Sequence, residues 1–363
     1  MTNTADILII GAGVAGLGAA AYLAPSARVV VLEGEAQPCY HTSGRSAAMF
    51  LTTYGPTGVR VASVASAPFY DDPPDVYEGP LLSPRGELHL DSGDGSDVAA
   101  ILAANPDYQD ISVGEALSMV PILNTDGISR VAFDPIGQDV DTDLLVAGYR
   151  RLIRAFAGQL VCNARVESLT RVGGQWRAVT PAGEFEAPII VNAAGAWATQ
   201  IAEMAGAAAI SIIPKRRSAA IVPLTEHDPR SWPMFFEADE SFYARPMGAG
   251  LMVSPAEEIA VEPQDMQIDK YDDVLVEGLW KYSQRVTVPL TQVLSPWAGL
   301  RSFSNDGEPV VGFDGQAEGF FWLAGQGGYG FQTSPALSQM VADLITGVEP
   351  SIDPELFTPA RFG

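Results

Sequence analysis

The chain begins with an apolar run that leads directly into a glycine-rich stretch. Residues 7–10 are Ile-Leu-Ile-Ile, as expected of a parallel strand buried on both faces. The glycine-rich stretch 11–16 follows, and then come a helical pattern over 17–23 and a second apolar strand over 28–33. The pattern predicts a complete β-α-β unit within the first 33 residues.

Farther along the chain, apolar runs alternate with helical patterns. Residues 86–91 alternate in polarity and predict a strand with Glu87 and His89 on one face and Leu88 and Leu90 on the other. A helix is predicted over 144–156, and strands over 160–170, 176–180 and 184–191 resemble one meander that leads into the small-residue loop 192–197. The remaining predictions are a region of mostly strand and loop over 206–300, including strands at 210–214, 218–222, 242–245 and 251–254, then a strand at 320–324, a glycine-rich loop at 325–330 and a helix at 335–345.

Glycine motifs at the start, middle and end of the chain predict an α/β protein whose cofactor domain is discontinuous. We expect a Rossmann-like cofactor-binding domain built from residues 1–76, 141–205 and 302–363. The intervening residues 77–140 and 206–301 are expected to form an α+β substrate domain with a mostly antiparallel sheet.

The first glycine motif indicates a dinucleotide site. Gly11 permits a tight turn, Gly13 lets the backbone approach a pyrophosphate, and Gly16 allows close helix–strand packing. The helix that begins at Val14 and Ala15 offers its positive N-terminus to phosphates, and the carboxylate of Glu33, followed by Gly34, can accept hydrogen bonds from a ribose. A second glycine cluster near the C-terminus favours the longer FAD over NAD.

Composition and charge argue against some classes of function. A net charge of −23 argues against nucleic-acid binding, because phosphates would be repelled. Cys39 and Cys162 suit free thiols in a reducing cytosol, and no run of residues predicts a transmembrane segment, so we expect a cytoplasmic protein. The three histidines lack zinc-ligand spacing, so no metal site is predicted.

Longer strings of residues resemble the FAD-dependent D-amino acid oxidase (DAO) superfamily, and within it the bacterial D-arginine and D-amino acid dehydrogenases. The resemblance implies a glycine-oxidase type of fold and non-covalent FAD, since no cysteine lies where some relatives attach the flavin. The strings that carry it are residues 41–48, 80–87, 214–218, 240–243, 297–303 and 325–330.

This resemblance also implies a set of FAD-binding residues. One group wraps the flavin, a second meets the adenine and lines the dinucleotide, and a third holds the pyrimidine side and the diphosphate. In chain order these residues are Ser43, Gly44, Arg45, Ser46, Ala47 and Ala48; then Val166, Ala194, Gly195 and Trp197; and then Arg301, Gly327, Gly328, Tyr329, Gly330, Phe331, Gln332 and Thr333.

The substrate site is implied in the same way. Arg301 and Tyr243 match a carboxylate clamp, in which an Arg fork binds a carboxylate and a phenol adds a directional donor. Without the family, such residues are more often a surface ion-pair partner and a packing residue. Tyr54, beside the substrate amine, Arg217 and Tyr329 complete the expected catalytic group, and Ser46, Met49, Glu87 and Gln332 join the substrate-binding set.

Two features of the predicted site favour different substrate side chains. Glu87 matches the carboxylate that binds a distal cation in enzymes of basic D-amino acids. Met49, Leu51, Phe236 and Phe331 are more apolar than such a pocket requires and favour burial of an apolar side chain. A basic and an apolar side chain therefore both stay open.

The implied reaction is hydride transfer from Cα of a D-amino acid to flavin N5. The product is an imino acid that hydrolyses to a 2-oxo acid and ammonia. A glycine- or sarcosine-type amine, or a 2-hydroxy acid, is the alternative substrate on the same fold. The electron acceptor, oxygen or a quinone-like carrier, stays open.

Overall fold

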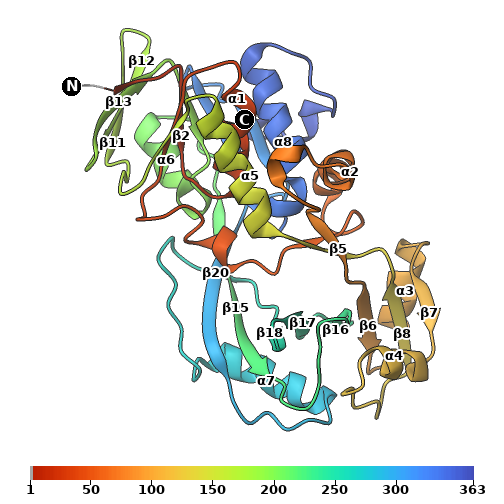
Figure 1. Ribbon diagram of the computed structural model, residues 1–363. Helices are drawn as coiled ribbons and strands as arrows, with labels where there is room; N and C mark the ends of the chain where they lie inside the picture. Colours follow the sequence, from red (N-terminus) through yellow and green to blue (C-terminus); the bar gives the residue numbers. More distant parts are fainter. Residues whose placement is uncertain (1–2) are drawn as a thin grey trace.

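The computed structural model describes residues 3–363 and has two lobes (Figure 1). One lobe contains helices α1, α5 and α8 and strand β2, and the other contains the long strands β15 and β20 together with β6 and β8. No helix within residues 3–363 is both long and apolar enough to cross a bilayer.

A six-stranded sheet forms the centre of the first lobe. Its strands are almost wholly buried because layers cover both faces: Ile7 and Ile9 face one core, and Leu8 and Ile10 face the other. The order is β10 (Gln159–Val161), β3 (Val29–Leu32), β2 (Ile7–Ile10), β14 (Ile189–Asn192), β22 (Phe320–Ala324) and the antiparallel edge strand β21 (Val310–Phe313).

Helices pack tightly on the first face of this sheet. Gly18 lies where α1 crosses α8, and a Cβ there would overlap the hydroxyl of Ser338, so a larger residue would push the two helices apart. The helices are α1 (Val14–Leu23), α2 (Thr57–Asp71), α5 (Thr142–Ala155) and α8 (Gly330–Thr346). Helix α8 begins five residues before the predicted start at 335, so residues 331–333 lie in its first turn and not in a loop.

The second face carries a smaller, mostly antiparallel sheet. It consists of β1 (Asn3–Thr4), β13 (Gly183–Ala187), β12 (Gln175–Thr180) and β11 (Ser168–Val172), with α6 (Ala198–Ala205) nearby. Among its described strands, β1 alone runs parallel to its neighbour. The prediction of one meander over 160–191 is wrong, because β10 and β14 at its two ends belong to the parallel sheet. The apolar run of β14 requires burial on both faces, which a place between β2 and β22 provides, while β10 pairs with β3 at the edge of the same sheet.

A ten-stranded sheet forms the second lobe. The predicted strands at 210–214 and 218–222 are largely one strand, β15, which begins at Ile213. The strands are β23 (Gln326–Gly327), β20 (Leu294–Phe303), β15 (Ile213–Pro223), β18 (Gly250–Ser254), β17 (Tyr243–Met247), β16 (Met234–Glu237), β6 (Glu87–Asp91), β8 (Arg130–Asp134) and β7 (Gln109–Ile111), with β19 (Ile259–Ala260) beside β15.

The two faces of this sheet differ. One face packs an apolar core in which Leu88 and Leu90 contact the region of α7 (Asp273–Arg285), a helix that the sequence reading missed, while α3 (Ser96–Ala104) and α4 (Val113–Met119) pack near β8. The other face carries Tyr243 and Met234 toward the first lobe. A short sheet of β4 (Met49–Phe50), β9 (Gln138–Val140) and β5 (Leu82–Pro84) lies beside the junction, and the predicted domain boundaries stay a prediction.

The first glycine motif supports a direct test of packing. A Cβ on Gly16 would overlap the carbonyl oxygen of Gly11, which itself has φ +102° and lies against Ala193. We expect Gly16→Ala to lower the free energy of unfolding by about 1–3 kcal/mol, because backbone must move to admit the methyl group. The matched control is Gly315→Ala, which meets nothing within 4 Å and should change stability by about 0.5 kcal/mol or less. Equal denaturation midpoints for the two variants would contradict this packing.

Candidate active site

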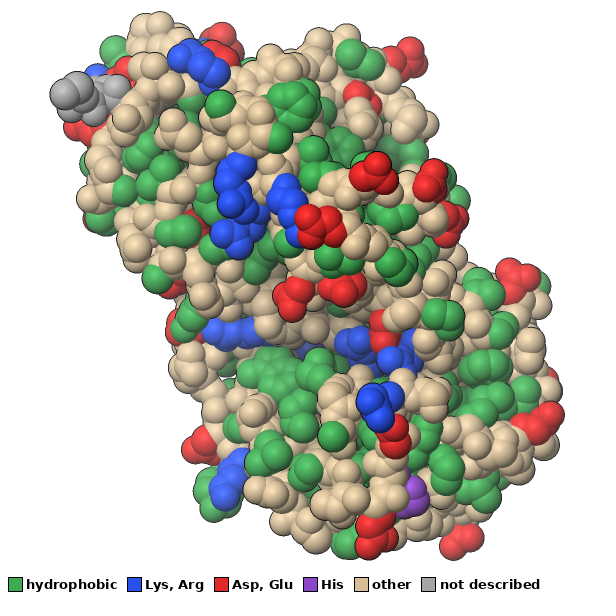
Figure 2. Space-filling model, viewed as in Figure 1, with side chains coloured by type: hydrophobic (Ala, Val, Ile, Leu, Met, Phe, Trp, Pro, Cys, Tyr) green, Lys and Arg blue, Asp and Glu red, His purple; other side chains and the backbone are tan. Residues whose placement is uncertain are grey.

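A cavity of about 520 Å³ lies between the two lobes. The first turn after β2, the residues following β3 and β14, and the start of α8 form one wall, and strands β6, β16 and β17 form another. Figure 2 shows basic side chains gathered along the waist between the lobes, on a surface that is otherwise rich in acidic groups. Ligands of open parallel sheets bind at this position, beyond the carboxyl ends of the strands.

The dinucleotide end of the cavity is built mainly from backbone. Gly11 occupies a left-handed conformation, and Glu33 accepts hydrogen bonds from the amides of Ala12 (2.7 Å) and Glu35 (2.9 Å), which fixes its carboxylate at the end of β3. Ser43 accepts from the amide of Val14 at 3.0 Å and joins the loop before β4 to the start of α1. This arrangement suits a diphosphate at the helix N-terminus and a ribose near Glu33.

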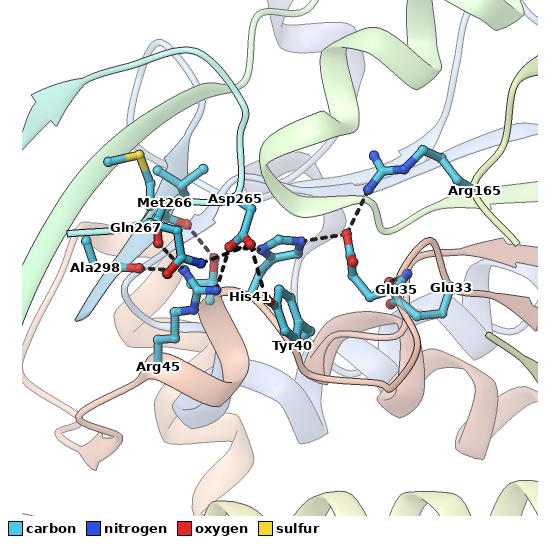
Figure 3. A network of polar contacts seen from close by, with 12 residues as sticks. Glu33, Glu35, Tyr40, His41, Arg45, Arg165, Asp265, Met266, Gln267 and Ala298 are labelled. Atoms are coloured by element: carbon cyan, nitrogen blue, oxygen red, sulfur yellow. Dashed lines mark hydrogen bonds and ion pairs between the residues drawn. The ribbon is translucent and has the colours of Figure 1, made fainter. Parts of the chain in front are cut away.

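A polar network braces this end from outside (Figure 3). Arg45 donates to the carbonyls of Ala298 (2.8 Å) and Met266 (2.9 Å) and pairs with Asp265 at 2.8 Å. His41 contacts Glu35 at 3.0 Å, and Arg165 pairs with the same carboxylate at 2.7 Å. Arg45 lines the cavity, and its guanidinium ties the loop to the second lobe, so its role in cofactor binding stays a prediction.

The loop before β4 carries backbone strain. Ala48 has φ +36°, which an alanine rarely adopts, and its amide donates to Ser46 Oγ at 3.0 Å. Arg245 on β17 donates to the carbonyl of Ala47 and pairs with Asp139 at 2.8 Å, and Arg85 binds the same carboxylate from β5's end. This buried cluster holds the strained loop against the cavity.

At the other end of the cavity lies the half-buried side chain of Arg301, on β20. Within residues 3–363 its guanidinium has no hydrogen bond and no ion pair. A Cβ on Gly328 would lie 2.8 Å from Arg301 Cζ, so the glycine is what lets this side chain lie flat against the loop before α8. The hydroxyl groups of Tyr243, Tyr54 and Tyr329 interact electrostatically with the Arg301 guanidinium.

These tyrosines and a second arginine complete the polar end. The rings of Tyr54 and Tyr329 contact each other edge to face at 5.4 Å, and burial raises the pKa of both phenols, so they remain proton donors at neutral pH. Arg217 lies 6.0 Å from the ring of Tyr243 and pairs with Glu258 at 3.2 Å. The structure thus brings all five predicted catalytic residues to one cavity.

Most other predicted site residues line the same cavity, and three do not. Gly16 packs under Gly11, Gly44 lies against the carbonyl of Cys39, and the Thr333 hydroxyl donates to the Tyr329 carbonyl within α8. Gln332 lines the cavity, but its amide donates to Ser63 on α2.

Sequence reasoning missed several residues of the wall. Tyr108 follows α3 and reaches the cavity from a separate segment, where its hydroxyl lies 3.3 Å from that of Thr53. Arg165 and Glu240 also line the wall, but neither stands in a motif that would have identified it. His89 does line the cavity, as the alternation over 86–91 allowed.

Residues 6–344 match the DAO family of FAD-dependent oxidoreductases. The chain belongs to this family. This oxidoreductase is 27% identical over 408 residues to bovine (Bos taurus) FAD-dependent oxidoreductase domain-containing protein 1, with 94% of this chain and 81% of the relative covered. It is 26% identical to mitochondrial dimethylglycine dehydrogenase of Rattus norvegicus, of which it spans 45% while 99% of this chain is covered.

The fold agrees with this membership. The oxidoreductase superposes on glycine oxidase from Geobacillus kaustophilus with a TM-score of 0.86, 21% identity and 98% coverage of each chain. FAD is therefore the cofactor, and the left-handed Gly11, the carboxylate of Glu33 and the N-terminus of α1 suit its dinucleotide part.

Arg245 holds the strained loop before β4, so we expect its loss to weaken FAD binding. Arg245→Met removes the donor to Ala47 and leaves Asp139 with one arginine fewer, so we expect the FAD dissociation constant to rise roughly tenfold. In an Ala48→Gly background the same substitution should raise the FAD dissociation constant by a smaller factor, because glycine adopts positive φ without strain. The measurement is fluorescence titration of apoprotein with FAD. The control is Arg177→Met on the exposed face of β12, and an effect of Arg245→Met that is no larger than the control's would exclude the bracing role.

Proposed function

We propose that this chain removes hydride from the α-carbon of a D-amino acid. The imino acid formed hydrolyses in water to a 2-oxo acid and ammonia. One observation carries the proposal, namely that the half-buried guanidinium of Arg301 faces the cavity with no anion from residues 3–363 bound to it.

A half-buried cation that lines a cavity favours an anionic ligand. Taking a guanidinium out of water is costly unless hydrogen bonds and an opposite charge replace the lost hydration. A carboxylate satisfies both needs, since the planar guanidinium can form two parallel hydrogen bonds with it. The nearby carboxylate of Glu258 already pairs with Arg217 and Lys215, so a substrate carboxylate is the natural partner for Arg301.

The surrounding phenols supply orientation. Tyr243 projects from β17 toward Arg301, and Tyr54 and Tyr329 approach the same guanidinium from two different loops. Donors that converge from three segments fix both the position and the tilt of a carboxylate, which sets the direction of the adjacent Cα–H bond.

FAD, when bound, accepts the hydride, and the chain supplies binding, orientation and exclusion of water. Burial raises the pKa of the phenols of Tyr54 and Tyr329, so these two groups donate hydrogen bonds and do not remove a proton from Cα. The neutral amine of the substrate assists departure of the hydride by forming the C=N bond. No histidine is required at this end of the cavity, and the one that lines the far wall, His89, stands on β6.

The relatives support an amine next to a carboxylate. Glycine and dimethylglycine, named in two of the similar proteins, both carry nitrogen on the carbon beside the carboxylate. The D configuration is supported by the resemblance of the strings around Arg217, Tyr243 and Arg301 to D-amino acid dehydrogenases.

The experiment is anaerobic mixing of the holoenzyme with D-amino acids, L-amino acids, N-methylglycine and 2-hydroxy acids. We expect D-amino acids to bleach the flavin absorbance near 450 nm fastest. Bleaching only by N-methylglycine or by 2-hydroxy acids would overturn the proposal. Admission of air afterwards distinguishes reoxidation by oxygen from a need for another acceptor.

A variant of Arg301 tests the clamp itself. Loss of one partner of a buried charge pair costs about 2–5 kcal/mol, so Arg301→Ala should lower kcat/KM roughly 30- to 5,000-fold. Arg301→Lys keeps the charge without the planar fork, so its kcat/KM should lie between that of the parent and that of Arg301→Ala. Steady-state kinetics with the exposed Arg177→Ala as control provide the measurement, and unchanged kcat/KM in Arg301→Ala would refute the assignment.

A further inference from the structure

Two buried polar atoms without a hydrogen-bond partner lie side by side at the far end of the cavity. Among residues 3–363, neither Glu87 Oε1 nor His89 Nε2 has a partner, although the second carboxylate oxygen of Glu87 lies only 3.7 Å from His89 Nε2. Both residues line the cavity, and the Glu87 side chain is 3% exposed. Buried polar groups are seldom left unsatisfied, so the pair points to a ligand that satisfies it.

The strand register places this pair relative to the clamp. Tyr243 on β17 pairs with Phe236 on β16, which in turn pairs with His89 on β6. Neighbouring strands lie about 4.8 Å apart, so the pair stands about 10 Å across the sheet from Tyr243. The stretch between them is apolar: Phe236 stacks on His89 at 5.1 Å, and Met234 neighbours Glu87.

Within the described residues, the groups packed around the pair supply no positive charge. Burial raises the pKa of Glu87, while His89 opposes that rise by stabilising the carboxylate. The other titratable groups that act on Glu87 are Asp134 on β8 and the phenol of Tyr108, and neither supplies a positive charge. The pair therefore offers an acceptor oxygen and a ring nitrogen in apolar surroundings, where a neutral partner is less costly to bury than a charged one.

We propose that the Glu87–His89 pair binds the end of the substrate side chain and selects a neutral group that both donates and accepts, such as a primary carboxamide. The amide NH₂ donates to Glu87 Oε1, and His89 Nε2–H donates to the amide oxygen. This inference rests on the proposed function for the position of the carboxylate at Arg301.

The same geometry disfavours the two other side-chain classes. With His89 Nε2–H as a donor, a distal cation would meet that donor beside Glu87, so His89 makes this site differ from a lone carboxylate that binds a cation. An aliphatic end leaves both polar atoms without partners, and sites built for hydrogen bonds discriminate strongly against ligands that lack them.

The test uses three unreactive carboxylates of matched length on the holoenzyme. They are 5-amino-5-oxopentanoate, with a terminal carboxamide, 5-aminopentanoate, with a terminal cation, and hexanoate, with an apolar end. Perturbation of the flavin spectrum reports each dissociation constant without any oxidation. We expect the carboxamide to bind at least tenfold more tightly than the other two, and equal or reversed affinities would overturn the inference.

Variants assign the selectivity to the pair. Glu87→Leu and His89→Phe should each reduce the ratio of carboxamide to hexanoate affinity at least fivefold. Asp91→Asn is the matched control, because Asp91 is a buried carboxylate on the same strand. It accepts hydrogen bonds from the backbone amides of Gly93 and Val98, away from the cavity. In this variant the ratio of carboxamide to hexanoate affinity should stay as in the parent. A ratio that both pair variants leave unchanged would also overturn the inference.

Oxidation provides the separate check on the function. If D-glutamine bleaches the flavin faster than D-lysine and D-norleucine, function and selectivity both stand. If no D-amino acid bleaches it while the order of the three carboxylates holds, the proposed reaction fails and the binding role of the pair survives. If D-lysine is the best substrate and Glu87→Leu removes that preference, the pair recognises a cation and the inference fails.

Discussion

A guanidinium that loses its water to a bound ligand needs an anion or several hydrogen-bond acceptors, and half-buried Arg301 obtains neither from residues 3–363. The scaffold nevertheless keeps the side chain in place, since β20 fixes its backbone and Gly328 allows the loop before α8 to lie against it. The cavity therefore retains unsatisfied positive charge within a chain whose net charge is −23. Acidic groups that could neutralise Arg301 are directed elsewhere: Glu258, for example, pairs with Arg217 and Lys215.

The two ends of the cavity use different chemistry because their ligands differ. The dinucleotide end presents backbone, glycines and one carboxylate, which suits a long ligand rich in phosphate and ribose groups. The end that we propose for the substrate presents side chains from strands of the second lobe, outside the parallel sheet. Arg45 and Arg245 connect the ends, because each arginine ties a loop of the first lobe to partners outside it.

Local patterns made much of the first lobe predictable. The apolar run 7–10, the glycine spacing and Glu33 specify a β-α-β unit within 33 residues, and each rule acts over a few positions. The alternation over 86–91 also placed Glu87 and His89 on one face correctly, although only the packing of β16 and Tyr108 shows that this face is buried. The resemblance to the family supplied the clamp, which no spacing rule contains.

Long-range pairing accounts for what could not be predicted. Asp139 pairs with Arg85 and Arg245, which lie more than 50 residues away in the sequence. None of the three local sequences indicates these ion pairs. Helix α7 was missed because its apolar face, with Leu275 and Leu279, is recognisable only against the sheet that it covers. Strands β10 and β14 were given to the wrong sheet for the same reason, since a strand's partners are set by the whole fold.

The most direct measurement of the central claim is the affinity of the holoenzyme for a 2-oxo acid, read from the flavin spectrum, in the parent and in Arg301→Met. A 2-oxo acid keeps the carboxylate but has no Cα–H bond to lose, so it reports the clamp alone. The account predicts saturable binding by the parent and a loss of roughly 30-fold or more in the variant. Equal affinity in the two proteins, with FAD still bound, would show that the carboxylate is held somewhere other than at Arg301.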